Sequence, residues 1–157
     1  MHQVTIYTDG CCKGNPGTGG WGAVLLWFNP KDNKPYHKEI SGGSPDTTNN
    51  IMELSGCIEA LKCLQGECEV TLYTDSKYVK QGITSWIRNW KKNGWLTTQK
   101  KPVANKELWL ELDRLAVKHH VKFRWVKGHG DNKLNELADA LANSGCDAVR
   151  SNEMINA

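Results

Sequence analysis

Four acidic residues lie at positions in the sequence that folding could bring together in space. Asp9 ends the segment QVTIYTD, and Asp75 ends the similar segment ECEVTLYTD. Both segments alternate apolar and polar positions and contain β-branched residues, which is typical of strands. Glu53 opens a helical pattern, and Asp139 lies on the polar side of another. If the two strands are parallel neighbours, their C-terminal ends meet at one edge of the sheet, where open α/β sheets place ligands.

A shared site for these four side chains needs a positive counter-charge. Aspartate ordinarily titrates near pH ~4, so all four carboxylates would be ionised and would repel one another at neutral pH. Divalent cations remove this penalty, and a site made only of carboxylates favours hard ions such as Mg²⁺ or Mn²⁺. Two such ions about 4 Å apart can hold the attacking and leaving oxygens of a phosphodiester in line. The four acids together therefore predict a metal centre for phosphodiester hydrolysis.

Each acid also has a purely structural interpretation. Asp9 is followed by a glycine and could belong to a plain turn. Asp75 could cap the following helix, and Glu53 has the spacing of a capping box with Asn50. Asp139 could be a solvated helix position. These alternatives stay open for each acid taken singly, and the metal-site hypothesis depends on all four together.

A histidine occurs in the glycine-rich segment KGHGDN, ahead of the last helical pattern. This residue, His129, lies between two glycines, as expected of a mobile loop. An imidazole titrates near pH ~6.5, which suits a proton shuttle near neutral pH. The alternative is an exposed loop histidine without a chemical role.

Positive charge is concentrated in one part of the chain. The formal net charge is only +3, yet residues 77–106 contain eight Lys or Arg residues and no acid. Cations beside flat aromatic groups suit a nucleic-acid backbone, although Trp86 and Trp90 could equally pack in the core. The residues of this candidate nucleic-acid surface are Trp86, Arg88, Trp90, Lys91, Lys92, Trp95, Lys100 and Lys101.

The elements that would position these residues follow the order βββαβααβα. Three strand-like segments with short links come first, which favours antiparallel neighbours. Helical periodicity then alternates with strand periodicity, and the segment 76–94 is expected to break near Gly82. This order predicts an α/β (mixed α+β) fold in which helices pack on a mixed sheet. We expect one domain over residues 1–146 and a polar tail over 147–157 that could be disordered.

Several classes of protein are excluded by what the chain lacks. No apolar run approaches the roughly 20 residues of a membrane span, and the first residues lack the pattern of a signal peptide. We therefore expect a cytoplasmic protein without membrane contact. None of the six cysteines forms a C-x-x-C pair, so we expect free thiols and no structural zinc.

Five segments closely resemble the successive motifs of type 1 ribonuclease H: TDGCCKGNPG, TTNNIMEL, YTDSKYV, WVKGHG and NELADALA. The resemblance runs in order from about residue 3 to about residue 145. It implies the ribonuclease H-like fold, a five-stranded mixed sheet flanked by helices. It also implies endonucleolytic hydrolysis of the RNA strand of RNA–DNA hybrids, with two Mg²⁺ or Mn²⁺ ions per site, leaving 5′-phosphate and 3′-hydroxyl ends.

The resemblance also implies roles for individual positions. The metal-binding catalytic carboxylates are implied to be Asp9, Glu53, Asp75 and Asp139, with His129 assisting proton transfer or product release. The positions implied to touch the RNA strand are Cys12, Asn15, Asn49 and Asn50. A DNA phosphate would bind at Thr48 and Asn105. The segment from Trp86 to Lys101 resembles the family's basic protrusion, and Lys77 stands where a glutamine is common in the family.

The expected partner is thus an RNA–DNA hybrid, bound by a monomeric, free-standing enzyme. A hybrid-binding protein with a degenerate catalytic site is the alternative, and the presence of all four acids argues against it. A third possibility is a transferase or a DNA nuclease on the same fold.

Overall fold

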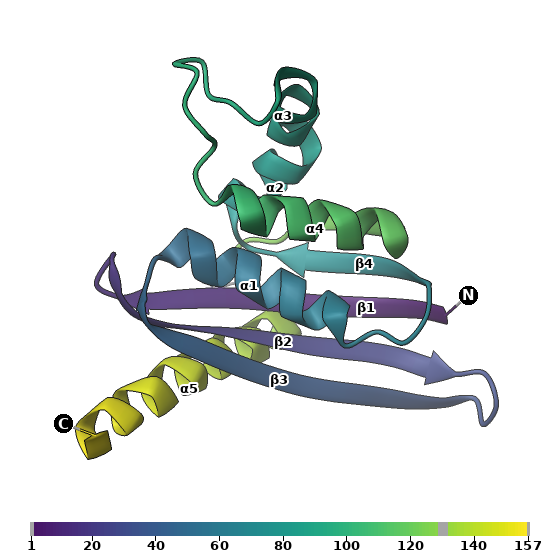
Figure 1. The fold of residues 1–157 in the computed structure, drawn as a ribbon. Coiled ribbons are helices and arrows are strands. Elements are labelled where there is room, and N and C mark those ends of the chain that lie inside the picture. Colours follow the sequence, from purple (N-terminus) through teal and green to yellow (C-terminus); the bar gives the residue numbers. More distant parts are fainter. Residues whose placement is uncertain (1, 129–131, 157) are drawn as a thin grey trace.

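The computed structural model describes residues 2–128 and 132–156 (Figure 1). Five strands form one mixed sheet in the order β3-β2-β1-β4-β5. These strands are β1 (His2–Lys13), β2 (Gly17–Asn29), β3 (Lys34–Thr47), β4 (Cys68–Thr74) and β5 (Val121–Trp125). The predicted α/β class is confirmed. The order of elements agrees with the prediction, except that the first helix expected after β4 consists of three short helical segments over residues 77–93.

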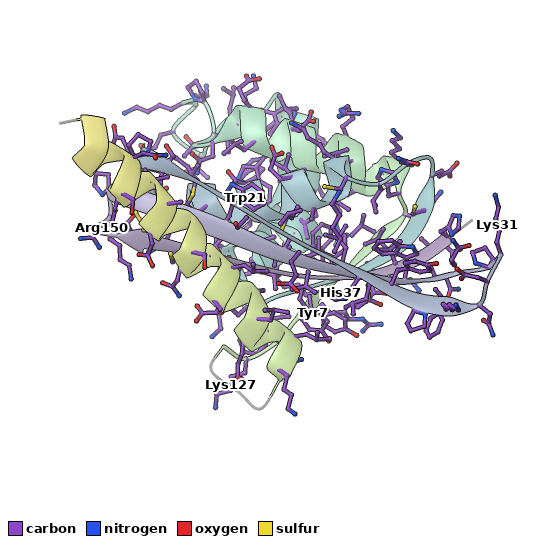
Figure 2. The ribbon with its side chains drawn as sticks, turned by 90° about the horizontal axis from the view of Figure 1, so that it is seen from below. Tyr7, Trp21, Lys31, His37, Lys127 and Arg150 are labelled. Atoms are coloured by element: carbon purple, nitrogen blue, oxygen red, sulfur yellow. The ribbon has the colours of Figure 1, made fainter. Side chains whose placement is uncertain are left out.

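Helices cover both faces of the sheet (Figure 1). Helices α1 (Asn49–Lys62) and α4 (Lys106–Lys118) lie on one face, and α5 (Lys133–Asn156) lies on the other. Beyond α4, the chain projects as α2 (Lys77–Gln81), the π-helical turn η1 (Gly82–Trp86) and α3 (Ile87–Asn93). Figure 2 shows α5 crossing the sheet from the end near Lys127 to the end near Arg150.

The register of the central strands brings distant segments of the sequence together. Strands β1 and β4 are parallel, with Thr8 opposite Thr74. Strands β1 and β2 are antiparallel and stay paired as far as Lys13, opposite Thr18. The sequence suggested that the first strand ends at Asp9, but its pairing with β2 extends the strand four residues further. Asp9 instead marks the point where the pairing with β4 stops.

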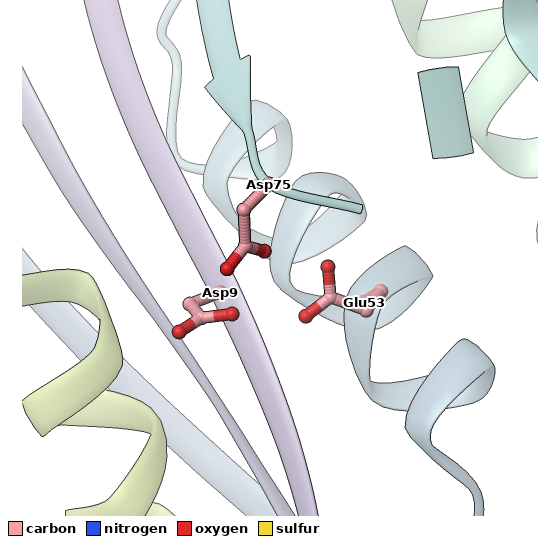
Figure 3. A group of neighbouring side chains, drawn as sticks. All are labelled: Asp9, Glu53 and Asp75. Atoms are coloured by element: carbon pink, nitrogen blue, oxygen red, sulfur yellow. The ribbon is translucent and has the colours of Figure 1, made fainter. Parts of the chain in front are cut away.

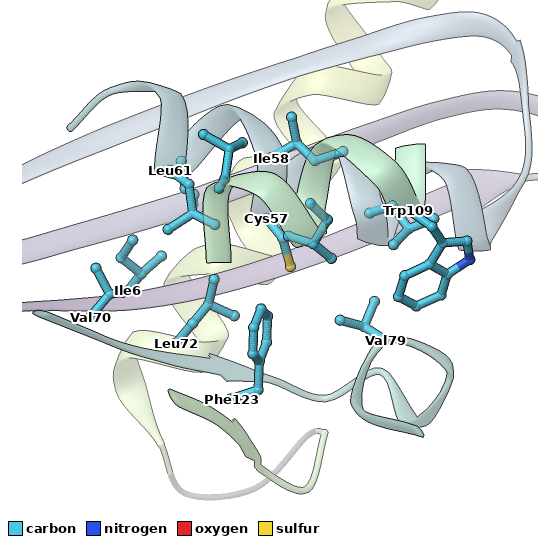
Figure 4. Close-up of a cluster of buried hydrophobic side chains, with 14 of the residues drawn as sticks. Ile6, Cys57, Ile58, Leu61, Val70, Leu72, Val79, Trp109 and Phe123 are labelled. Carbon is cyan, nitrogen blue, oxygen red and sulfur yellow. The ribbon is translucent and has the colours of Figure 1, made fainter. Parts of the chain in front are cut away.

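The main hydrophobic core fills the space between the sheet and helices α1 and α4 (Figure 4). Its largest fully buried side chain is Trp109, whose indole Nε1 donates to the hydroxyl of Tyr78 at 3.0 Å. A smaller cluster under α5 contains Tyr7, Val24 and Ala138. Val24 and its neighbour Leu25 are buried in the two different clusters, so β2 is covered on both of its faces there.

Helix α1 begins earlier than the sequence suggested. The N-cap is Thr48, whose Oγ1 accepts a hydrogen bond from the amide of Ile51 at 3.2 Å. The expected capping box between Asn50 and Glu53 is therefore wrong, because the helix already includes Asn50 and Thr48 satisfies the free amide. This leaves the Glu53 carboxylate available for another role.

The predicted break near Gly82 is a π-helical turn between α2 and α3. Gly82 is buried against Trp109, and a Cβ atom added to Gly82 would come within 2.0 Å of the indole ring. Gly94 has a φ of 80° and ends α3 in the left-handed conformation, which glycine adopts without steric cost. The prediction that this helical segment ends at Gly94 is confirmed.

The last helix is longer than expected. Helix α5 continues to Asn156, so residues 147–156 are helical and do not form the disordered tail that the sequence suggested. Its middle packs closely on the sheet, since a Cβ atom added to Gly145 would lie 2.1 Å from the carbonyl oxygen of Gly42. Whether the domain itself ends at residue 146 stays a prediction. Within the described ranges, no helix combines the length and apolarity that membrane crossing requires.

Candidate active site

Three carboxylates meet at the end of the parallel strands (Figure 3). Asp9 comes from β1, Asp75 directly follows β4, and Glu53 comes from α1. One carboxylate oxygen from each lies within 4.8 Å of the other two. The strand register explains the meeting, because Thr8 and Thr74 are paired and the next residue of each strand emerges at the same edge. The prediction that these three acids converge is confirmed.

Two glycines allow the backbone to approach this cluster closely. A Cβ atom on Gly10 would lie 2.7 Å from the Glu53 amide nitrogen and 2.8 Å from Glu53 Oε1. A Cβ atom on Gly128 would lie 2.9 Å from Asp75 Oδ2. Neither glycine was among the predicted site residues, although each lies beside one of them in the motifs TDG and KGHG.

The electrostatics of the cluster disfavour ionisation. Burial, followed by the negative charges of Glu53 and Asp75, raises the pKa of Asp9 far above its usual range. Burial, followed by the charge of Asp75, also raises the pKa of Glu53. Asp9 is 6% exposed and Glu53 is 8% exposed, so water provides little compensation. The arrangement is one that a cation would stabilise strongly.

The donor set fits a hard divalent cation. All the candidate ligand atoms are carboxylate oxygens, which Mg²⁺ and Mn²⁺ prefer. Within the part of the chain that the structure describes, Glu53 Oε2 is buried and has no hydrogen-bond partner. Buried polar atoms normally have a partner, so an unpartnered carboxylate oxygen among three acids fits a site that binds a cation.

The fourth predicted acid lies beside this cluster. Asp139 comes from α5, on the opposite face of the sheet, and its side chain contributes a hydrogen bond that helps to raise the pKa of Asp9. It is not one of the three acids within 4.8 Å of one another. His129 lies outside the described residues. The last described residue before it, Gly128, is the residue that approaches Asp75.

The four positions expected to contact RNA gather beside the N-terminus of α1. Asn15 Oδ1 accepts a hydrogen bond from the amide of Asn49 at 3.2 Å, which joins the turn after β1 to the helix. Cys12 Sγ lies 2.6 Å from the carbonyl oxygen of Gly14 and 3.4 Å from that of Thr47, and its single S–H donates to one of them at a time. Asn50 is exposed in the first turn of α1. These four residues therefore lie near one another around the N-terminus of α1.

The two positions expected to bind a DNA phosphate lie at helix N-termini. Thr48 caps α1, and Asn105 precedes α4 in the left-handed conformation, with a φ of 60°. Both helices begin at the same end of the sheet (Figure 1). Asn105 Nδ2 donates to the hydroxyl of Tyr78 at 3.2 Å. Helix N-termini carry partial positive charge and attract anions, so this end of the sheet suits a phosphate.

The basic segment contains tryptophan side chains that pack against other residues and lysine side chains that are exposed. Trp90 and Trp95 pack against the main core, so the packing interpretation of Trp90 is confirmed. Trp86 is half-buried and contacts the ring of Tyr78 edge-on, with centroids 5.7 Å apart. Of the lysines, Lys91 forms an ion pair with Asp113 at 2.8 Å. The other exposed lysines of the predicted surface are Lys92, Lys100 and Lys101.

Fold and site together define an α/β protein with a buried carboxylate cluster at the edge of a mixed sheet, suited to divalent cations. Residues 1–147 match the RNase H family. The chain therefore belongs to the ribonuclease H family, and the resemblance found in its motifs is confirmed.

Individual relatives agree with this assignment. A protein of Caulobacter vibrioides named Ribonuclease HI is 57% identical over 91% of this chain and 92% of its own length. A Ribonuclease H of Cupriavidus necator is 52% identical over 95% of this chain and 99% of its own length.

Solved structures give the same fold. LC9-RNase H1, described as a type 1 RNase H with the type 2 active-site motif, has a TM-score of 0.84 and 32% identity, covering 94% of this chain and 73% of that one. LC11-RNase H1, solved in complex with an RNA/DNA hybrid, has a TM-score of 0.66 and 25% identity, covering 93% and 98% of the two chains.

Proposed function

We propose that this protein is an endonuclease that hydrolyses the RNA strand of RNA–DNA hybrids, leaving 5′-phosphate and 3′-hydroxyl ends. The observation that carries the proposal is the convergence of Asp9, Glu53 and Asp75, from three different elements, within 4.8 Å. Relatives of similar length are named ribonuclease H, and LC11-RNase H1 has been solved with an RNA/DNA hybrid.

The carboxylate cluster is proposed to hold Mg²⁺ or Mn²⁺, two ions per site when substrate is present. Asp9, Glu53 and Asp75 would supply most of the ligand oxygens, and Asp139 would complete the set from the α5 side. Such ions, when bound, activate a water molecule and stabilise the leaving 3′ oxygen. The protein's own part is to keep four acids close together without water, which the burial of Asp9 and Glu53 supports.

The surfaces on either side of the cluster are proposed to distinguish the two strands of the hybrid. Cys12, Asn15, Asn49 and Asn50 would contact the RNA strand, whose 2′-hydroxyl groups mark it as RNA. The DNA strand would lie on the Trp86 side, with one phosphate at Thr48 and Asn105. The exposed lysines would add contacts to phosphates, which position a nucleic acid without reading its bases.

His129 is proposed to assist proton transfer or product release from the loop before α5. Its place next to Gly128 in the sequence supports this role, because Gly128 approaches the Asp75 carboxylate. We further propose that the enzyme acts as a monomer in the cytoplasm. Light scattering of the purified protein would test the oligomeric state.

The experiment that tests the proposal compares three labelled substrates: an RNA–DNA hybrid, duplex RNA and duplex DNA. With Mg²⁺, we expect rapid cleavage of the RNA strand of the hybrid only, and no cleavage by the Asp75→Asn variant. Binding of the hybrid without cleavage would instead support a hybrid-binding protein with a degenerate site. Cleavage of duplex DNA at the rate of the hybrid would support a DNA nuclease.

A further inference from the structure

One exposed tryptophan outside the basic segment contacts the backbone of a proposed metal ligand. Trp125 is the last residue of β5 and is 41% exposed, among the most exposed of the large hydrophobic side chains. Its indole Nε1 donates a hydrogen bond to the backbone carbonyl oxygen of Asp75 at 3.0 Å. An indole N–H can only donate, so the direction of this bond is fixed.

The hydrogen bond completes a set that holds the chain on each side of Asp75. The carbonyl of Thr74 accepts from the amide of Val126 at 2.9 Å, which extends the pairing of β4 with β5. The amide of Ser76 donates to Thr74 Oγ1 at 3.1 Å, and Ser76 Oγ in turn caps α2. Between these two neighbours, the hydrogen bond from Trp125 fixes the carbonyl group of Asp75 itself.

Trp125 is also close in sequence to the residue that lies against the Asp75 carboxylate. Three residues after Trp125, Gly128 passes so close that a Cβ atom there would lie 2.9 Å from Asp75 Oδ2. The indole therefore ties the end of β5 to the Asp75 backbone just before the chain reaches the carboxylate. A shift of the indole would move both the backbone of Asp75 and the chain near Gly128.

The ammonium group of Lys77 lies near the exposed indole ring. Lys77 Nζ lies 5.5 Å from the centroid of the Trp125 ring, within the range of cation–π attraction. Lys77 belongs to α2, which starts two residues after Asp75. The indole is thus held by its N–H on the Asp75 side and by an ammonium group on its face, which explains how an exposed side chain keeps one orientation.

We infer that Trp125 is a positioning residue: its indole N–H fixes the backbone of Asp75, so that the Asp75 carboxylate is already oriented toward Asp9 and Glu53 before a cation binds. The inference rests on the proposed function for the role of Asp75 as a metal ligand. A site whose ligands are held in place binds its ion more tightly than one that must reorganise. Trp125 therefore acts through Asp75 and does not touch the substrate.

The test compares Trp125→Phe with the wild type and with Trp27→Phe, a matched control in β2 that stacks on Tyr36. The first readout is the midpoint of a calorimetric Mg²⁺ titration of the folded protein, without substrate. Loss of one hydrogen bond predicts an increase of about two- to tenfold for Trp125→Phe, and no change for Trp27→Phe. An unchanged midpoint for Trp125→Phe would overturn the inference.

Kinetics supply the second readout. At a fixed Mg²⁺ concentration well below the wild-type midpoint, we expect kcat of Trp125→Phe to fall by a similar factor, while the KM for the hybrid is unchanged. A raised KM with an unchanged kcat would overturn the inference, because it would make Trp125 a substrate contact. Lys77→Gln keeps the indole N–H bond and should raise the Mg²⁺ midpoint less than Trp125→Phe does.

A measurement on the wild-type protein covers the case in which Trp125→Phe does not fold. The indole N–H of Trp125 should exchange with solvent more slowly than a free indole, and its NMR signal should shift on addition of Mg²⁺. Exchange at the rate of a free indole would contradict the hydrogen bond. If the wild type binds Mg²⁺ but cleaves no hybrid, the proposed function fails, whereas the midpoint comparison still tests the role of Trp125.

Discussion

At the scale of single residues, the site is a set of buried acids that oppose one another's ionisation. Asp9 and Glu53 are nearly inaccessible, and each has a raised pKa because of burial and neighbouring negative charge. For a carboxyl whose pKa is higher in the folded state, stability is lost as the pH rises above the ordinary value of about 4. At neutral pH, the buried acids should therefore lower the free energy of unfolding of the metal-free protein.

Asp9→Asn replaces one of these acids by a neutral amide, which removes the cost of keeping a buried carboxyl protonated at neutral pH, and should abolish cleavage while stabilising the metal-free protein. In EDTA at pH 7, we expect its free energy of unfolding in urea to exceed that of the wild type by about 1–3 kcal/mol, the usual cost of an uncompensated buried polar group. The difference should shrink as the pH is lowered toward 4. The exposed Asp147 offers a control, since Asp147→Asn should change little. A less stable Asp9→Asn protein in EDTA would contradict the repulsion.

A second residue-scale prediction concerns His119, which ends α4 and is 1% exposed. Burial, followed by the positive charge of Lys118, lowers the pKa of His119, and its Nδ1 accepts the amide proton of Cys68 at 3.3 Å. Because the folded state holds this ring neutral, the unfolded chain takes up a proton first as the pH falls below ~6.5. The free energy of unfolding should therefore decrease as the pH is lowered from 7 to 5.

His119→Gln isolates this contribution, because a glutamine oxygen can accept the same hydrogen bond but does not titrate. We expect the variant to lose less stability than the wild type between pH 7 and 5, measured by urea unfolding at each pH. Equal losses in the two proteins would mean that His119 does not contribute to the acid sensitivity.

The sequence revealed the chemistry of several residues but not their environment. The repeated Tyr-Thr-Asp segments predicted that Asp9 and Asp75 would emerge together, because strand periodicity is visible in one chain. The structural alternative for Asp75 as a helix cap is excluded, since Ser76 caps α2. Trp125 could not be predicted as a partner of Asp75, because that contact depends on how β4 and β5 align.

At the scale of elements, the site depends on how closely α1 approaches β1. A Cβ atom on Gly10 would overlap the Glu53 backbone at 2.7 Å, so Gly10→Ala must displace the helix that carries Glu53. We expect a loss of about 1–3 kcal/mol in stability, typical of overpacking, and a large loss of activity. Urea unfolding and the hybrid cleavage assay measure the two effects.

Gly56→Ala, in the helix that carries Glu53, provides a matched control. Its added Cβ atom would meet nothing closer than 3.4 Å, and alanine is a better helix former than glycine. This variant should keep its activity and be as stable as the wild type or more so. Similar losses for Gly10→Ala and Gly56→Ala would show that the close approach at the site is not what makes glycine necessary.

The types of the elements were predictable from periodicity, and their limits were not. The first strand continues past Asp9 because β2 remains paired with it, which no local pattern indicates. A glycine is needed at Gly82 because the indole of Trp109, far along the chain, fills the space beside it. Helix α5 continues beyond Cys146 through residues whose polar composition alone suggested a tail.

At the scale of the whole molecule, the basic segment belongs to the part of the chain that projects beyond α4 (Figure 1). Binding of a hybrid should weaken steeply with salt, with each lysine that contacts a phosphate contributing about 0.9 to the slope of log K against log salt. Lys92→Gln should lower that slope by about one. Lys91→Gln should lower it less, because Lys91 is already paired with Asp113. Binding titrations at several salt concentrations measure both slopes, and equal slopes in all three proteins would exclude the basic segment from binding.

The central claim is that acids from β1, α1 and the end of β4 form one cation site. The most direct test is a crystal structure with Mn²⁺, in which anomalous scattering locates the ion independently of the protein atoms. We predict an anomalous peak within about 2.2 Å of carboxylate oxygens from Asp9, Glu53 and Asp75, the usual distance for such ligands. A crystal with no peak at this cluster, or with its only peaks elsewhere on the molecule, would contradict the account.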